Sequence, residues 1–455
     1  MSEYLHPSVS SKITDNSFVF QTATGNTVLF QCILAEKGED NVLTLVTTPD
    51  EFIFKFGDPN VSKYGQASYN VLNWLAAGGV AYVIRVLPTT ATFALTGLSV
   101  VANAGTAPLT LAVREYAASN MASVGAINSF LTTEAATTGD EKVFPLGIVI
   151  PFGRGAGYNG LGVRISLEDA LDTTYDFRTY SLEVTVKDAL GVDTAIEGPF
   201  TVSFDPTARS KSRESMYWAY VVNKYSQYVK IVDRRSTFDN LVDLMNNHVV
   251  AAGEDLSPNS YDILFGMPRA ADPDDAYDGW TWATPATIAA SGLTLATAAN
   301  LADLSKPLYL GGGTDGVWNG EDSEDALLAK GYAGAIDASV MDTQFFEFDV
   351  LLDANYPLAV KNAIAALAQT VRGDCVAMLD VGFQANAAQT LSYRQGSLTV
   401  GNRLVSIWAH DMQTYDIYNG ENIKVTTPYL LATRIPENDR DFGVQWPFVG
   451  PRRGI

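Results

Sequence analysis

The chain has 455 residues, of which 47% are hydrophobic and 18% are charged, and its formal net charge is −21. This composition fits a globular protein of about two to four domains with sizeable cores, and it excludes an intrinsically disordered chain. The acidic balance argues against nucleic acid and anionic membrane surfaces as partners, because both are bound through clustered Lys and Arg, and it fits a partner with a basic face.

Residues 1–20 are polar and show no compact pattern, so we expect an N-terminal arm. The first residues, MSEYLHPSVSSK, lack the apolar segment of a secretory signal. No stretch approaches the ~18 apolar residues of a membrane-spanning helix. We therefore expect a soluble protein that is made in a cytoplasm and does not insert into a membrane.

The run GNTVLFQCILA predicts a strand, and a short helix follows it. The next stretch, SKYGQASYNVLNWLAAGGVAYVIRVLP, predicts a helix that Ser62 caps and that Gly78 and Gly79 stop. Its side chains recur at helical spacing: Tyr64, Ala67, Ser68, Val71, Leu72 and Leu75. Residues 80–87 are then apolar on both faces apart from Arg85, as in a buried strand of an α/β sheet.

The residue pattern changes over 89–318, and Thr, Ala, Gly, Ser and Val dominate 89–140. The alternating runs GLGVRISL, YSLEVTV and PFTVSF predict strands. An amphipathic helix is predicted from one apolar face: Phe238, Leu241, Val242, Met245 and Val249. Residues 251–300 are rich in loops, so the whole segment is predicted to be mainly β structure.

Alternation of helix and strand returns after residue 320. A helix over 323–332 precedes the strand FFEFDVLLD, and the strands CVAMLDVG and RLVSIWAHD follow later. Between FFEFDVLLD and CVAMLDVG a helix is predicted from spacing at i, i+4, i+7 and i+11: Val360, Ile364, Leu367 and Val371.

The predicted fold is therefore a layered α/β core formed by two discontinuous segments, with a β-rich insertion domain. The chain as a whole is predicted to be α+β. The core segments are 21–88 and 319–455, and the outward insertion is 89–318. A further division of the insertion into 89–145 and 146–318 is left open.

Two glycine-rich stretches resemble nucleotide loops but do not fit one. GGGTDG lacks the Lys of a phosphate-binding loop, and four acidic residues precede the next one, Lys330. GRGAGYNG satisfies G-x-G-x-x-G, yet a strand pattern and no helix follows it. We expect no cofactor, and we assign structural turns to these stretches and to the end of the first long helix: Gly78, Gly79, Gly157, Asn159, Gly311, Gly312, Gly313 and Asp315.

Other chemistry is weakly supported. His410 and Asp411 are adjacent at a predicted strand end, but no Ser or Cys nucleophile can be paired with them from the sequence. The acids of DPDDAYDGWTW do not have the spacing of a calcium loop, and an ion site there stays a minor alternative: Asp272, Asp274, Asp275 and Asp278. Carbohydrate binding through Trp280 and Trp282 of the same loop is another minor alternative.

Cys32 and Cys375 lie in apolar runs, which favours two buried thiols and leaves a disulfide open; two cysteines cannot make a zinc site. With no metal site and no catalytic set, the sequence favours a structural protein that is not an enzyme.

Several short stretches of the chain resemble segments of a single protein family. They are YLHPSVSSKITDNSF, FIFKFGDPN with KYGQASYNVLNWLAAGGVAYVIRVLP, GRGAGYNGLGVRIS, PLYLGGGTDG, VRGDCVAMLDVG, WAHDMQTYDIYNG and WPFVGPRRGI. In this order they resemble segments of the tail sheath proteins of contractile-tailed bacteriophages. Each stretch alone is weakly specific, and their shared order along most of the chain makes the resemblance specific.

The resemblance implies a subunit of hexameric rings that stack helically around a tail tube, contract without a nucleotide, and drive the tube through the host envelope. Implied partners are further copies of the chain, the tail tube protein, the baseplate and the tail terminator. The implied location is the virion tail, assembled in the host bacterial cytoplasm.

The arm, with Pro7, Val9 and Ile13, is implied to link subunits by adding a strand to a neighbour's sheet. Sheath subunits usually continue into an inner domain beyond the segment that WPFVGPRRGI resembles, and we expect that domain to be missing here. A tailocin or other contractile injection system is an alternative setting, and a hydrolase using His410 and Asp411 is an alternative of another class.

Overall fold

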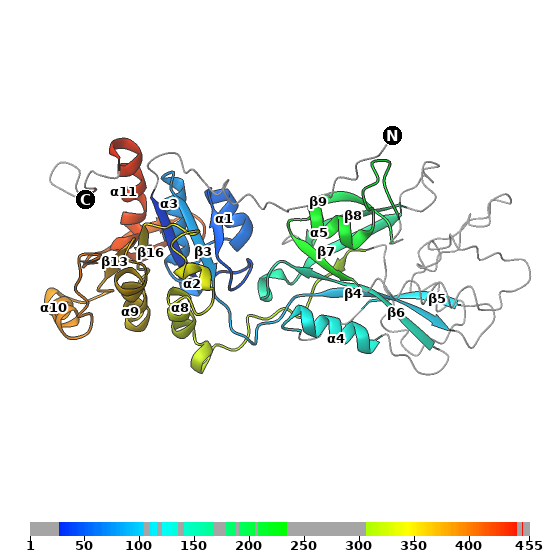
Figure 1. The fold of residues 1–455 in the computed structure, drawn as a ribbon, viewed down its shortest axis with the longest axis horizontal. Helices are drawn as coiled ribbons and strands as arrows, with labels where there is room; N and C mark the ends of the chain where they lie inside the picture. Colours follow the sequence, from blue (N-terminus) through cyan, green and yellow to red (C-terminus); the bar gives the residue numbers. More distant parts are fainter. Residues whose placement is uncertain are drawn as a thin grey trace, which may run out of the picture.

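The computed structural model describes residues 27–103, 110–115, 121–134, 141–167, 179–187, 191–204, 208–233, 306–443 and 448. One sheet, in the order β14-β13-β12-β1-β3-β2, lies at the centre of the core (Figure 1). Its strands are β1 (Val28–Ile33), β2 (Thr44–Val46), β3 (Val80–Arg85), β12 (Val350–Leu352), β13 (Val376–Asp380) and β14 (Val405–Trp408). All neighbours pair in parallel except β2, which is antiparallel to β3.

The two halves of the core meet in the middle of this sheet. β1 pairs with β12, and Leu29 lies opposite Val350 in the register although the two are far apart in the sequence. The chain builds outward from β1 to β3 and, after the insertion, outward the other way from β12 to β14. This is a doubly wound sheet, and its order reverses between β1 and β12. The predicted layered core of two discontinuous segments is thereby confirmed.

Helices cover both faces of the sheet. α3 packs against α11, α8 packs against α9, and Figure 1 shows the two pairs on opposite sides of the strands. The helices of the core are α1 (Pro49–Phe56), α2 (Val61–Tyr64), α3 (Ala67–Ala76), η5 (Gly320–Asp322), α8 (Glu324–Tyr332), η6 (Ala338–Met341), α9 (Leu358–Ala366), η7 (Leu367–Arg372), α10 (Ala387–Gly396) and α11 (Thr427–Phe442). A separate hairpin, β15 (Asp411–Asp416) with β16 (Glu421–Thr426), precedes α11.

The inserted segment folds as two antiparallel sheets that share one apolar core. The first, in the order β10-β6-β4-β5, contains β4 (Thr96–Asn103), β5 (Thr110–Glu115), β6 (Glu141–Pro151) and β10 (Val229–Asp233). The second, in the order β11-β7-β8-β9, contains β7 (Leu161–Leu167), β8 (Tyr180–Lys187), β9 (Asp193–Val202) and β11 (Leu308–Tyr309), and the helices are α4 (Val124–Glu134), η2 (Ala156–Tyr158) and α5 (Trp218–Tyr225). The β-rich character is confirmed; β6 runs across residue 145, and the predicted domain boundaries stay predictions.

Two predicted element boundaries differ from the structure. Ser62 does not cap the long helix: Asn60 caps the short α2, Gly65 ends it at φ 74°, and α3 starts anew at Ala67. The strand expected over FFEFDVLLD is reduced to the three residues of β12.

The predicted helix over Phe238 to Val249, the acidic loop with its tryptophans, and the N-terminal arm lie outside the described residues. Within the part that the structure describes, no helix is long and apolar enough to cross a membrane.

Candidate functional site

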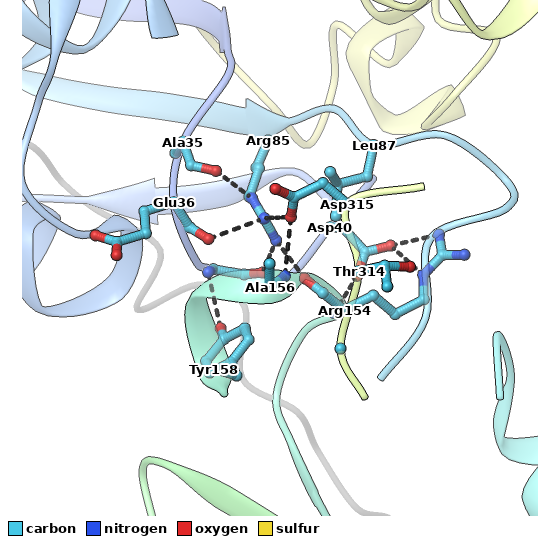
Figure 2. A network of polar contacts seen from close by, with 12 residues as sticks. Ala35, Glu36, Asp40, Arg85, Leu87, Arg154, Ala156, Tyr158, Thr314 and Asp315 are labelled. Atoms are coloured by element: carbon cyan, nitrogen blue, oxygen red, sulfur yellow. Dashed lines mark hydrogen bonds and ion pairs between the residues drawn. The ribbon is translucent and has the colours of Figure 1, made fainter. Parts of the chain in front are cut away.

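Arg85, at the end of β3, is the centre of a junction between the α/β core and the insertion. Its side chain has no exposed surface. It donates to four backbone carbonyls: Nε to Ala35 at 3.0 Å, Nη2 to Glu36 at 3.2 Å, and Nη1 to Gly38 at 3.0 Å and Arg154 at 2.7 Å (Figure 2). Only a guanidinium offers this many donors in one rigid plane, so Arg85 holds the loop after β1 and the turn after β6 together.

A second arginine fastens the same two segments from the other side. Arg154 forms a two-point pair with Asp40, with Nη2 at 2.6 Å and Nε at 3.0 Å from Oδ2. Its backbone N–H also donates to Asp40 Oδ1 at 2.9 Å. Nη1 of Arg154 reaches the carbonyls of Thr89 and Ala91, where the chain leaves the core. The pair is mostly buried, so solvent screens it little.

The returning chain, 311–315, closes the junction. Asp315 Oδ1 accepts the Ala156 N–H at 3.0 Å and lies 3.7 Å from Arg85 Nη2. The Asn159 side chain makes a two-way pair with the backbone of Gly313, with both distances 2.9 Å. Three stretches distant in sequence, the end of β3, the turn 153–160 and the return 311–315, therefore form one contact site, as Figure 2 shows in part.

The glycines of this site leave room for backbone contact. Gly155 has φ 128°, and an added Cβ would lie 2.8 Å from both Arg85 Nη2 and Asp315 Oδ1. A Cβ on Gly157 would lie 2.3 Å from the carbonyl oxygen of Glu36, and one on Gly313 would lie 2.4 Å from that of Gly155. At these positions the missing side chain permits the fit, which is a mechanical role.

Burial is the main cause of the pKa shifts at this junction. Burial lowers the pKa of the Arg85 guanidinium, while Tyr158, Asp40 and Asp315 act in the opposite direction. Burial likewise raises the pKa of Tyr158, whose hydroxyl accepts the Gly38 N–H at 2.7 Å. The acids that surround the two arginines would repel a phosphate, so the site is suited to holding backbone in place and not to binding a nucleotide.

Six of the predicted turn residues lie in this junction: Gly157, Asn159, Gly311, Gly312, Gly313 and Asp315. Gly78 and Gly79 lie elsewhere, after α3, where a Cβ on Gly79 would meet the Trp74 ring at 2.3 Å. Pro7, Val9 and Ile13 lie outside the described residues.

Sequence reasoning missed the two arginines and their partner Asp40. The available signal was Arg85 itself, a charged residue in an otherwise apolar strand, which must find partners when buried.

The crevice at the strand-order reversal is the usual ligand site of a doubly wound sheet. Here a cleft of about 310 Å³ is lined by residues of both charges, among them Lys63, Lys424, Glu324 and Asp325. The turn after β1 reads LAEKGED and has no glycine-rich phosphate loop. This crevice therefore lacks the loop with which a doubly wound sheet commonly holds a phosphate.

The possible catalytic residues are not arranged for catalysis. His410 is exposed, and its neighbour Asp411 is paired with Lys424. Among the described residues, no group of three His, Cys, Asp or Glu is placed to hold a metal ion. Cys32 and Cys375 are buried and unpaired with each other, and burial raises the pKa of Cys375 to about 12, so neither thiol is reactive.

No known protein family and no curated protein matches the chain. Among solved structures, a sheath tail protein from Listeria innocua has 8% identity and a TM-score of 0.40, and the alignment covers 93% of this chain and 59% of that one. A sheath tail protein from Desulfitobacterium hafniense has 10% identity and a TM-score of 0.37, with 91% and 59% covered. The chain thus spans about 59% of the length of each of these proteins.

Proposed function

We propose that the chain is a structural, non-enzymatic subunit of a contractile tail sheath. One observation carries the proposal: three stretches that resemble sheath subunits, YVIRVLP, GRGAGYNG and PLYLGGGTDG, meet at the Arg85 junction. Short motifs that match by chance have no reason to converge in space. Their convergence supports a shared architecture in which the insertion is fixed to the core at this point.

The junction has the physical properties that a force-bearing subunit needs. Its contacts are mostly buried and charge-assisted: Arg85 bonds to backbone carbonyls, and Arg154 forms a two-point pair with Asp40, so they are short and resist rotation. A sheath that contracts by sliding rigid subunits between two packings requires each subunit to move as one body. The Arg85 and Arg154 contacts supply that stiffness between core and insertion.

Linkage between subunits requires a free sheet edge. The β15–β16 hairpin has two strands, and within the described residues neither outer edge pairs with a third strand. An extended arm can add to such an edge through backbone hydrogen bonds. We propose that residues 1–20 of a neighbouring subunit, with Pro7, Val9 and Ile13, add there or at an equivalent edge.

The proposed partners are copies of the chain in helically stacked hexameric rings, the tail tube protein, the baseplate and the tail terminator, in a virion tail assembled in the host cytoplasm. The net charge of −21 fits a basic face on one of them. A tailocin or another injection system uses the same subunit design, and neighbouring genes distinguish these settings.

Negative-stain electron microscopy of the purified full gene product tests the proposal. Striated tubes of uniform diameter are expected at some ionic strength, because sheath subunits self-assemble. A protein that stays dispersed from low to high salt, while circular dichroism shows it folded, would contradict the proposal.

The hydrolase alternative has less support, because His410 is exposed and Asp411 is bound to Lys424. Loss of a measured hydrolytic activity in His410→Ala, with the fold intact, would revive it.

A further inference from the structure

A buried ion pair with a second acid beside it lies at the carboxyl ends of β12 and β13. Lys361 of α9 is 1% exposed, and Asp353 and Asp380 are 0% exposed. Lys361 Nζ lies 2.7 Å from Asp353 Oδ2 and 2.5 Å from the backbone carbonyl oxygen of Asp380. Lys and Asp are rarely fully buried, because removing two charges from water costs several kcal/mol for each ion.

The surroundings of the Asp353 carboxyl resemble a site for acyl transfer. Oδ1 accepts the N–H groups of Ala354 at 2.7 Å and Tyr356 at 3.0 Å. Two backbone donors on one oxygen are the arrangement that stabilises a tetrahedral oxyanion. The other oxygen, Oδ2, lies 2.7 Å from the lysine nitrogen and accepts the Asp380 N–H at 2.9 Å, so the carboxyl and the amine are held side by side.

Asp380 supplies a group that can carry a proton. Its Oδ1 accepts the Gly382 N–H at 2.7 Å, but its buried Oδ2 has no hydrogen-bond partner. The nearby Thr427 hydroxyl donates instead to the carbonyl of His410. Burial raises the pKa of Asp380 to about 6, and the charges of Asp353 and Lys361 both act on it. An acid with these properties can give and take a proton near neutral pH.

We propose that Lys361 and Asp353 are joined by an intramolecular isopeptide bond that forms after folding. A proton passes from the ammonium to the carboxylate, which leaves a neutral amine and a neutral carboxylic acid. The Nζ lone pair attacks Cγ of Asp353, the tetrahedral oxyanion forms on Oδ1, and Asp380 relays a proton from nitrogen to Oδ2. The bond from Cγ to Oδ2 breaks, one water leaves, and the chain loses two hydrogens and one oxygen.

The product fits the contacts already present. The amide nitrogen keeps one hydrogen, and the Asp380 carbonyl is placed to accept it. The amide oxygen keeps the N–H groups of Ala354 and Tyr356. Two buried charges become one neutral amide, which removes the desolvation cost of the pair. The bond ties central strand β12 to helix α9 whether or not the chain is a sheath subunit.

Intact mass spectrometry of the denatured protein tests the proposal directly. The expected mass is lower than the sequence mass by one water. Lys361 is the one tryptic site between Lys330 and Arg372, and an acylated lysine is not cleaved. A single peptide over 331–372, lighter by one water, is therefore expected. Separate peptides ending at Lys361 and at Arg372, or a water loss that maps elsewhere, would overturn the proposal and leave an ion pair only.

Two variants distinguish the chemistry from a general effect on folding. Lys361→Arg keeps the positive charge but removes the amine, so the full sequence mass is expected. Asp380→Asn keeps both reacting groups and removes the proton carrier, so most molecules should keep the full mass while circular dichroism shows them folded. A cross-linked Asp380→Asn protein that forms as fast as wild type would remove Asp380 from the mechanism.

Discussion

Among the junction residues, substitution of Arg85 should lower the free energy of unfolding most. Arg85→Met leaves four carbonyls without their donor and Asp315 without its paired guanidinium, around a side chain that is fully buried. Breaking a buried charged network costs about 3–5 kcal/mol, so the urea midpoint should fall strongly. Arg85→Lys keeps the charge but loses the planar fork, and it should recover only part of the loss.

Arg164→Met is the matched control for that experiment. Arg164 pairs with Glu183 at 3.8 Å on a partly exposed strand, and such pairs contribute about 0–1 kcal/mol. Equal shifts for the Arg85 and Arg164 variants would mean that the junction is not the stabilising element that its contacts indicate.

Gly155 tests whether the junction needs a glycine or only a turn. At φ 128° Gly155→Ala is strained, and its Cβ would also press on Arg85 and Asp315. Gly191 has φ 80° with open space around a Cβ, so Gly191→Ala suffers the strain alone. We expect a loss of about 3 kcal/mol or more for Gly155→Ala and about 1 kcal/mol for Gly191→Ala. Thermal unfolding compares the two, and equal losses would show that crowding at Arg85 is unimportant.

At the scale of elements, a polar cluster fixes the turn of the β15–β16 hairpin to the core. The Tyr69 hydroxyl donates to Asp416 Oδ2 at 2.6 Å, and Asn419 donates to the same oxygen at 2.7 Å. Burial acts to raise the pKa of Asp416, but these hydrogen bonds outweigh it and the pKa is lowered. The cluster therefore contributes stability above the ordinary aspartate pKa and loses it as the pH falls through the lowered value.

Removing the phenolic hydroxyl of Tyr69 should loosen this hairpin. Tyr69→Phe should cost about 1–2 kcal/mol at pH 7, and the cost should shrink as the pH falls through the lowered pKa of Asp416, because the carboxyl is then protonated in the folded state as well. Hydrogen exchange should speed up in 411–426. Tyr415→Phe, on the same hairpin and 59% exposed, is the control and should change little. A Tyr69→Phe cost that is the same at pH 7 and at the most acidic pH at which the wild type stays folded would contradict the argument.

The sequence predicted most elements but not their irregular points. The spacing that placed Val371 on a buried face assumed a regular α-helix, whereas the chain adopts a π-helix over η7. Val371 is therefore 41% exposed, and Arg372 turns inward to stack on Phe348 at 3.7 Å and to hold the carbonyls of Val340 and Phe346. The wider turn is chosen by these tertiary contacts, and a local pattern does not contain them.

At the scale of the whole molecule, the discontinuous core was predictable because both segments carry buried parallel strands alternating with helices. The pairing of β1 with β12 was not, because register across hundreds of residues leaves no local trace. The same holds for the site: the glycines 311–313 and Gly157 stood out in the sequence, but Arg85, Asp40 and Arg154 became a unit only in space.

Assembly is the property of the whole chain that the proposed function requires. Deleting residues 1–20 from the full gene product should leave a folded subunit, because the contacts described for the core and the junction join residues from 27 onward. The same subunit should fail to form ordered tubes in negative stain, because the proposed backbone pairing to a neighbour's edge is lost. Replacing Pro7, Val9 and Ile13 with Asp keeps the arm's length and removes its apolar and rigid positions, so it should weaken tubes less than the deletion does. Normal tubes from the deleted protein would remove the arm from the linkage, while unfolded protein would show that the arm belongs to the fold.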